Sequence, residues 1–210
     1  MRRRLVGPLL LLLLALVVCA AADVPSGAPA SSAPVGSPVA SPGPEASGSP
    51  SVAAPSSPEV QRPEWFDLEM VDVQTGEPFT INDYAGKVVL LETMAIWCPT
   101  CRRQGDEVAR LHELLGDPEE LVSVSLDVDM GENAETLARY ADELGYDWHF
   151  AVAPLLVARA LGNLYSAQYL NPPISPMLIV DRDGSVLGLP FGDVKSAEAL
   201  AGVIEPLLDR

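Results

Sequence analysis

Two cysteines, Cys98 and Cys101, carry the most informative chemistry in the sequence. They are separated by two residues and follow an apolar run at residues 88–92, so the pattern predicts that they open a helix after a buried strand. A helix N-terminus stabilises a thiolate and can lower a thiol pKa from about 8.5 to roughly 3.5–7.5. We therefore expect Cys98 to be the nucleophile and the more exposed sulfur, and Cys101 to resolve the mixed disulfide as its redox partner.

Two other interpretations of the cysteine pair are weaker. A zinc site needs four ligands, but only His112 and His149 remain as soft partners in the domain, and they lack a paired spacing. A purely structural disulfide would close a very short loop and constrain little of the unfolded chain. The acidic residues Asp127, Asp129 and Glu132 are interpreted as the start of a helix rather than as a metal loop. The sequence thus predicts neither a metal nor a cofactor.

The segments around the cysteines alternate between expected strands and helices. The run at 88–92 is apolar throughout, which is typical of a strand buried on both faces. This order predicts an α/β domain with a mixed central sheet and helices on both faces. Strands are expected at 66–73, 79–81, 88–92, 121–128, 148–152, 177–180 and 185–189, and helices at 98–115, 132–144, 154–161 and 196–208.

The stretch Lys-Val-Val-Leu-Leu at 87–91, followed by Ala-Ile-Trp-Cys-Pro-Thr-Cys at 95–101, resembles the thioredoxin superfamily. It looks most like the membrane-tethered branch of TlpA, ResA and CcmG type. The resemblance covers about 65–210 and implies a thioredoxin-like fold with an N-terminal β extension and a central insert at 127–150. It also implies a thiol–disulfide oxidoreductase that reduces exported proteins, including apocytochrome c before haem attachment, and is recharged by a membrane thiol electron donor.

The resemblance also gives roles to residues around the pair. The sequence Ile-Ser-Pro-Met-Leu-Ile-Val resembles the family's cis-proline segment, so Pro176 is expected to be cis and to lie against the disulfide. Ser175 is then expected to offer backbone hydrogen bonds to a partner, and Trp97 and Pro99 to contact it. Pro172, in contrast, is interpreted as shaping a loop.

Glu92 stands six residues before Cys98, inside the apolar run, where a carboxylate is costly to bury. Thioredoxins hold a buried Asp at the matching place, which exchanges a proton with the resolving cysteine. The resemblance therefore implies that Glu92 has a raised pKa and accepts the proton of Cys101. The alternative is a carboxylate at the end of the strand that reaches solvent.

The N-terminus has the order of an export signal. A basic region at 1–4 precedes an apolar region at 9–18 and small residues at 20–22. The apolar run at 5–22 is at the lower limit for a membrane-spanning helix. The sequence Leu-Val-Val-Cys ending at Cys19 resembles a bacterial lipoprotein signal, which implies lipidation of Cys19. Cleavage, an uncleaved anchor and lipidation all predict a domain outside the cytoplasm.

The three parts of the chain follow from composition. Residues 1–22 are the predicted signal or anchor, and 23–63 consist almost entirely of Pro, Ser, Ala, Gly and Val, which predicts a disordered linker. Residues 64–210 form the predicted folded domain. The net charge of -16 argues against nucleic acid as a partner, because like charges repel. Disulfide-containing or dithiol exported proteins are the expected partners.

Two other activities on the same fold stay as alternatives. A thiol peroxidase places an activating Arg in a Pro-rich loop with its reactive Cys, whereas Arg102 and Arg103 follow Cys101. A copper-binding assembly factor of Sco type uses a Cys-x-x-x-Cys spacing and a distant His. Here the spacing is one residue shorter, and His149 is the only late histidine.

Overall fold

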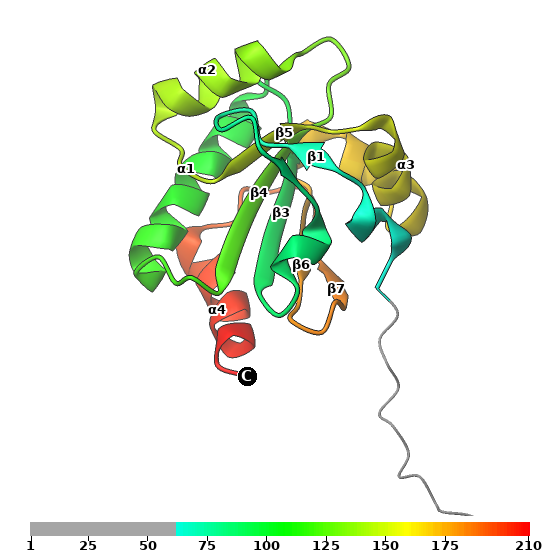
Figure 1. The fold of residues 1–210 in the computed structure, drawn as a ribbon. Coiled ribbons are helices and arrows are strands. Elements are labelled where there is room, and N and C mark those ends of the chain that lie inside the picture. Colours follow the sequence, from blue (N-terminus) through cyan, green and yellow to red (C-terminus); the bar gives the residue numbers. More distant parts are fainter. Residues whose placement is uncertain (1–61) are drawn as a thin grey trace, which may run out of the picture. The chain divides into compact units, whose positions relative to one another are not determined.

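The computed structural model describes residues 62–210, so the predictions for the signal, the linker and Cys19 lie outside the described residues. The centre of the domain is a mixed sheet with the strand order β5–β4–β3–β6–β7 (Figure 1). The three strands β3, β4 and β5 are parallel, and β6 and β7 run antiparallel. Their bounds are Val88–Met94 for β3, Leu121–Asp127 for β4, His149–Val152 for β5, Met177–Val180 for β6 and Val186–Gly188 for β7.

Strand β3 is the middle strand and is buried along its whole length. Parallel pairing with β4 and antiparallel pairing with β6 satisfy its backbone on both edges, while helices cover both faces. Its register places Glu92 beside Ser125 of β4 and Met177 of β6. The apolar run therefore forms the buried strand that its sequence predicts.

The helices cover the two faces of this sheet (Figure 1). Helices α1 and α4 pack against each other on one face, with α2 beside them, and α3 lies on the opposite face. Alternate side chains of β3 enter two cores: Leu90 and Met94 face α1, whereas Val89 and Leu91 face α3. The helix bounds are Pro99–Leu115 for α1, Ala134–Leu144 for α2, Leu155–Leu164 for α3 and Ala197–Leu208 for α4.

Capping residues set the helix ends. Ser196 caps α4 as predicted, with its Oγ accepting from the Ala199 N–H at 3.2 Å. Helix α2 begins later than predicted, because Asn133 is its N-cap and forms a capping box with Thr136. The acidic stretch that ends at Glu132 therefore precedes α2, and its interpretation as the start of this helix is wrong.

The N-terminal segment differs from its prediction. Instead of two full strands it forms two 3-10 helices and two short antiparallel strands, β1 and β2. Trp65 and Phe66 are consecutive and both buried, which the alternation of a strand against one face does not allow. The bounds are Glu64–Asp67 and Ile81–Tyr84 for the 3-10 helices η1 and η2, Met70–Val71 for β1 and Pro78–Phe79 for β2.

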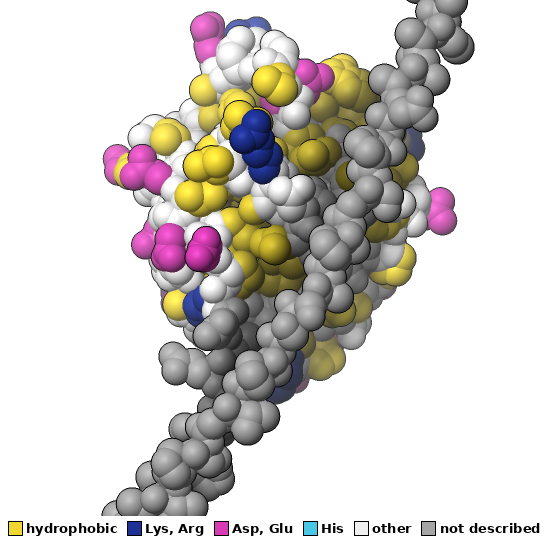
Figure 2. All heavy atoms as spheres, turned by 90° about the vertical axis from the view of Figure 1, so that its right-hand side faces the viewer, with side chains coloured by type: hydrophobic (Ala, Val, Ile, Leu, Met, Phe, Trp, Pro, Cys, Tyr) yellow, Lys and Arg dark blue, Asp and Glu magenta, His cyan; other side chains and the backbone are white. Residues whose placement is uncertain are grey.

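Hydrophobic side chains gather on the face that carries α3 (Figure 2). Trp65, Leu156 and Leu164 line a groove of about 750 Å³ there, and the two leucines are exposed. This groove lies on the face of the sheet opposite to α1, where the cysteines are. None of the helices within residues 62–210 combines the length and the hydropathy needed to cross a membrane.

Candidate redox-active site

The two cysteines form a disulfide at the first turn of α1, with their Cα atoms 5.3 Å apart. Cys98 is the N-cap, and its Sγ accepts a hydrogen bond from the Cys101 N–H at 3.1 Å. Pro99 occupies the first helical position, where its missing N–H costs nothing. The start of the helix therefore directs a backbone donor and the positive end of its dipole at Cys98.

Both cysteines are buried, with exposures of 1% for Cys98 and 4% for Cys101. The expectation that Cys98 is the more exposed is wrong, because its side chain turns back over the first turn of α1 to accept the Cys101 N–H. The exposed surface next to the disulfide comes from Trp97, which is 57% exposed, and from Pro99. The Trp97 indole N–H donates to Oδ2 of Asp129 at 2.5 Å, which holds the ring at the surface.

Glu92 lies on the same face of the sheet as the disulfide and is only 6% exposed. Its Oε1 accepts from the Ser125 hydroxyl at 2.6 Å, and that hydroxyl accepts from the Trp148 indole N–H at 2.9 Å. Burial raises the pKa of Glu92 to about 7, opposed by the Ser125 hydrogen bond and by the positive charge of Lys195. Glu92 is thus not a strand-end carboxylate in solvent, and it can gain or lose a proton near neutral pH.

The segment before β6 is the third part of the site. Pro176 is buried, and its carbonyl oxygen accepts from the Thr93 N–H at 3.1 Å, which places this proline beside the end of β3. Ser175 has a φ of 47°, a left-handed conformation that few residues other than glycine adopt. The Ser175 N–H donates to Pro172 O at 3.0 Å, and its carbonyl accepts from Lys195 Nζ at 2.6 Å. The cis state of Pro176 stays a prediction.

Pro172 contributes more than the shape of a loop. It begins the 3-10 helix η4 (Pro172–Ile174), which packs against α1, and its carbonyl oxygen lies 3.5 Å from Sγ of Cys101. A thiol on Cys101 would find a hydrogen-bond acceptor at this position. The loop before Pro176 therefore reaches the disulfide through Pro172 as well.

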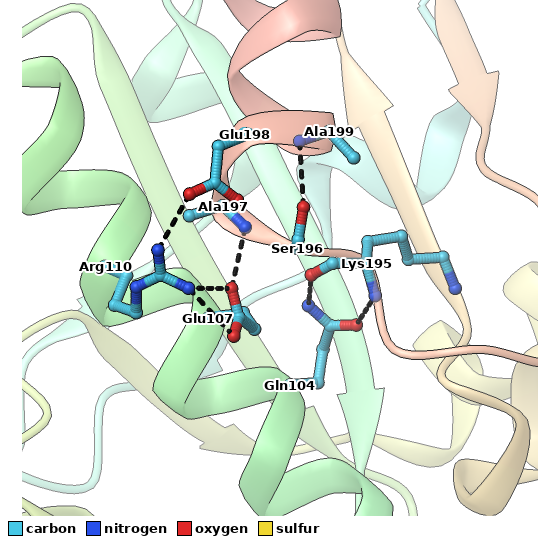
Figure 3. A network of polar contacts seen from close by, with 8 residues as sticks. All are labelled: Gln104, Glu107, Arg110, Lys195, Ser196, Ala197, Glu198 and Ala199. Carbon is cyan, nitrogen blue, oxygen red and sulfur yellow. Dashed lines mark hydrogen bonds and ion pairs between the residues drawn. The ribbon is translucent and has the colours of Figure 1, made fainter.

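Gln104 and Lys195 belong to this site and were not predicted from the sequence. Gln104, one turn after Cys101 on α1, is 1% exposed. Its Nε2 donates to Lys195 O at 3.0 Å, and its Oε1 accepts from the Lys195 N–H at 2.8 Å (Figure 3). The sequence feature that could have indicated Gln104 is its place as a polar residue on the apolar face of α1, between Cys101 and Val108.

The acidic residues after β4 contact the segment before Cys98. The Ile96 N–H donates to Oε2 of Glu132 at 2.8 Å, and Asp129 binds the indole of Trp97. Asp127 is fully buried, and burial together with the neighbouring Glu132 raises its pKa to about 8. Within residues 62–210, no three His, Cys, Asp or Glu side chains form a grouping suited to a metal. Glu132 and Asp129 instead hold the backbone and the tryptophan that precede Cys98.

A mixed sheet between helices, with a disulfide at the first turn of the helix after the middle strand, defines a thioredoxin-like thiol–disulfide oxidoreductase. In the amino-acid sequence, residues 49–202 match the Redoxin family. That match spans well over half of the chain, and the chain belongs to the Redoxin family.

Solved structures agree with this fold. A thiol:disulfide interchange protein from Chlorobium tepidum matches with a TM-score of 0.54 and 19% identity, over 67% of this chain and 92% of that one. DsbF of Mycobacterium tuberculosis (MTB) matches with a TM-score of 0.55 and 17% identity, over 70% and 99%. A secreted thiol-disulfide isomerase from Corynebacterium glutamicum matches with a TM-score of 0.55 and 20% identity, over 69% and 84%. At these identities the structures establish the fold.

Proposed function

We propose that this protein is an extracytoplasmic reductase that transfers two electrons from Cys98 and Cys101 to disulfides of exported proteins. The observation that carries the proposal is the cysteine pair at the start of α1, where Cys98 Sγ already accepts a backbone N–H. The export-signal features of residues 1–22 support the location outside the cytoplasm. A similar structure from Corynebacterium glutamicum is described as secreted, which is consistent with that location.

The reaction starts from the dithiol form. The Cys98 thiolate attacks one sulfur of the partner disulfide, the partner S–S bond breaks, and one partner sulfur leaves as a thiolate. Cys101 then gives its proton to the Glu92 carboxylate, and its thiolate attacks Cys98 Sγ. The second partner sulfur leaves, the Cys98–Cys101 disulfide forms, and the partner has gained two electrons. Both partner thiolates take up protons according to their pKa values.

Three features of the site support this proposed reaction. The helix N-terminus and the Cys101 N–H stabilise a thiolate on Cys98, which makes it a nucleophile and a leaving group at neutral pH. Glu92, with its pKa raised to about 7 by burial, is partly ionised at neutral pH and can therefore accept a proton there. Trp97 and Pro99 provide exposed contact area beside the buried sulfurs.

The oxidised pair must be reduced again after each cycle. A membrane protein with a reactive dithiol would supply the two electrons by a second thiol–disulfide exchange. Anchoring through residues 1–22 or through a lipid on Cys19 would keep the domain near such a donor. Apocytochromes c, whose cysteines must be reduced before haem attachment, are the partner class suggested by the resemblance to the TlpA, ResA and CcmG branch.

The test uses the full chain, with insulin reduction by dithiothreitol as the assay and Cys19→Ser as the control. We expect Cys98→Ser to abolish catalysis, and Cys101→Ser to accumulate a mixed disulfide on Cys98. The Cys19→Ser variant should reduce insulin at the wild-type rate.

The equilibrium reduction potential gives the direction of electron transfer: a value near -270 mV supports a reductase, and one near -120 mV indicates an oxidant. The absence of any reversible redox transition would overturn the proposal.

A further inference from the structure

Lys195 lies in the segment that precedes α4 and is fixed to α1 by its backbone. The Gln104 side chain binds both the N–H and the carbonyl of Lys195, at 2.8 and 3.0 Å (Figure 3). Gln104 is buried and one helical turn after Cys101, so it is held by the same helix that carries the disulfide. The position of Lys195 relative to the cysteines is therefore set by two hydrogen bonds across 91 residues of sequence.

The Lys195 side chain runs from this anchor to the loop before β6. Its ammonium group donates to Ser175 O at 2.6 Å and to Asp193 O at 3.2 Å. Hydrogen bonds from a charged donor are stronger than neutral ones, so the shorter contact holds Ser175 in its left-handed conformation directly before Pro176. Lys195 thus connects α1 with the loop that precedes β6.

The same ammonium group is also placed toward Glu92, because Ser175, whose carbonyl it binds, stands two residues before Met177, the partner of Glu92 in the sheet register. Two groups lower the pKa of Glu92 against the effect of burial, the Ser125 hydroxyl on β4 and Lys195. The other titratable groups that interact with Glu92 are the phenols of Tyr140 on α2 and of Tyr146, whose pKa values are raised in part by its negative charge. Partial burial lowers the pKa of Lys195, while Glu92 and Asp193 oppose that effect. Of these groups, only Lys195 carries a positive charge.

We propose that Lys195 is a positioning residue of the redox centre, which fixes the Ser175 carbonyl and supplies the positive charge that Glu92 requires when it ionises. This inference rests on the proposed role of Glu92 as acceptor of the Cys101 proton. Without Lys195, a buried carboxylate at Glu92 loses its countercharge, so Glu92 keeps its proton to higher pH. Resolution of the mixed disulfide by Cys101 then slows at neutral pH.

The experiment follows oxidation of the dithiol form of the full chain by excess oxidised glutathione in a stopped-flow instrument between pH 5 and 9. At high glutathione disulfide the resolving step limits the rate. We expect Lys195→Gln to move the inflection of the pH profile upward by about one pH unit, which lowers the rate about tenfold below the inflection. Lys195→Arg should restore the wild-type profile. The matched control is Lys87→Gln, because Lys87 is an exposed lysine directly before β3.

Two further variants keep the outcomes distinct. Lys195→Met preserves the apolar stem without the charge and serves if Lys195→Gln does not fold. Glu92→Gln should remove the inflection near pH 7 and leave only that of the thiol itself, and adding Lys195→Gln to it should then have no further effect on the profile. An inflection near pH 7 that persists in Glu92→Gln would overturn the role proposed for Glu92. A different outcome would overturn the inference about Lys195 alone. In that case Glu92→Gln removes the inflection near pH 7, but Lys195→Gln and Lys195→Met leave it at the wild-type pH.

Discussion

Glu92 and Lys195 show which site residues a sequence can reveal. The cysteine pair and Glu92 have local signals: a two-residue separation before a helix, and a carboxylate inside an apolar run. Lys195 has none, since it stands in the polar stretch Asp-Val-Lys-Ser and is held in place by Gln104, 91 residues away, and by the carbonyl of Ser175. Long-range side-chain contacts of this kind depend on the packing of α1 against α4, which a local pattern does not contain.

The raised pKa of Glu92 has a consequence for stability. The folded protein binds the proton of Glu92 up to about pH 7, whereas the unfolded chain releases it near its ordinary pKa of 4.5. The folded state therefore binds more protons between these values, and the free energy of unfolding falls as pH rises through this window. The loss attributable to Glu92 is on the order of 3 kcal/mol.

We expect Glu92→Gln to remove this part of the pH dependence. Urea unfolding of the oxidised wild type and the variant at pH 5 and pH 8 measures it. The variant should gain stability relative to wild type as the pH rises, because Gln does not ionise in the core. Asp127, whose pKa is also raised by burial, is present in both proteins and cancels in the comparison. Parallel pH dependences of wild type and variant would contradict the expectation.

At the scale of elements, the long uniform patterns and the hairpin of β6 and β7 were predicted correctly, whereas the N-terminal segment was not. Strand β3 and helix α1 agree with their predicted places because each has a long uniform pattern, and Gly116 ends α1 in a left-handed conformation. The N-terminal segment was predicted as strands, yet the capping box of Thr80 with Asp83 turns the chain into a 3-10 helix. Short segments are decided by such side-chain contacts and by tertiary packing rather than by propensity.

Helix α1 contains a glycine that its packing requires. A Cβ at Gly105 would lie 2.8 Å from Cε2 of Tyr146. That ring cannot easily move, since its hydroxyl donates to Asp106 at 2.7 Å and it stacks on Trp148 with centroids 4.6 Å apart. We expect Gly105→Ala to destabilise the protein by about 1–3 kcal/mol through overpacking, although alanine favours a helix.

Gly202 provides the matched control on α4. A Cβ there meets no atom within 4 Å, so only the helix preference remains. Gly202→Ala should stabilise the protein by roughly 0.5–1 kcal/mol. Both variants are compared by urea unfolding at neutral pH. Destabilisation by the two substitutions alike would argue against the close packing of Tyr146 on α1.

At the scale of the whole domain, the sheet separates two hydrophobic cores that differ in what they contain. The core under α1 and α4 contains the disulfide, and the core under α3 contains the N-terminal segment. His149 on β5 ties that segment to the sheet, with Nδ1 2.6 Å from Asp72 Oδ2 and Nε2 2.8 Å from the Tyr84 hydroxyl. The sequence did not assign His149 a role, because both partners lie more than 60 residues away.

We expect His149→Leu to lower stability by about 1–3 kcal/mol, because it leaves the buried Asp72 carboxyl without one of its partners. The reduction potential should stay at the wild-type value, since His149 lies on the face opposite to the disulfide. The control is Arg139→Ala, which removes an exposed ion pair with Glu135 on α2 and should change stability by less than about 0.5 kcal/mol. A shift in the potential would show that the two faces are coupled.

A chain of hydrogen bonds links the indole of Trp148 through Ser125 to Glu92. Tryptophan fluorescence can therefore report whether the buried carboxyl group of Glu92 carries a proton. The Ser125 hydroxyl donates to the carboxyl group and accepts from the indole, so a change in the charge of Glu92 alters the field and the hydrogen bond at the indole ring. Indole emission depends on both. Trp148 is therefore a natural fluorophore for the protonation state of the site, and it needs no label and no turnover to report it.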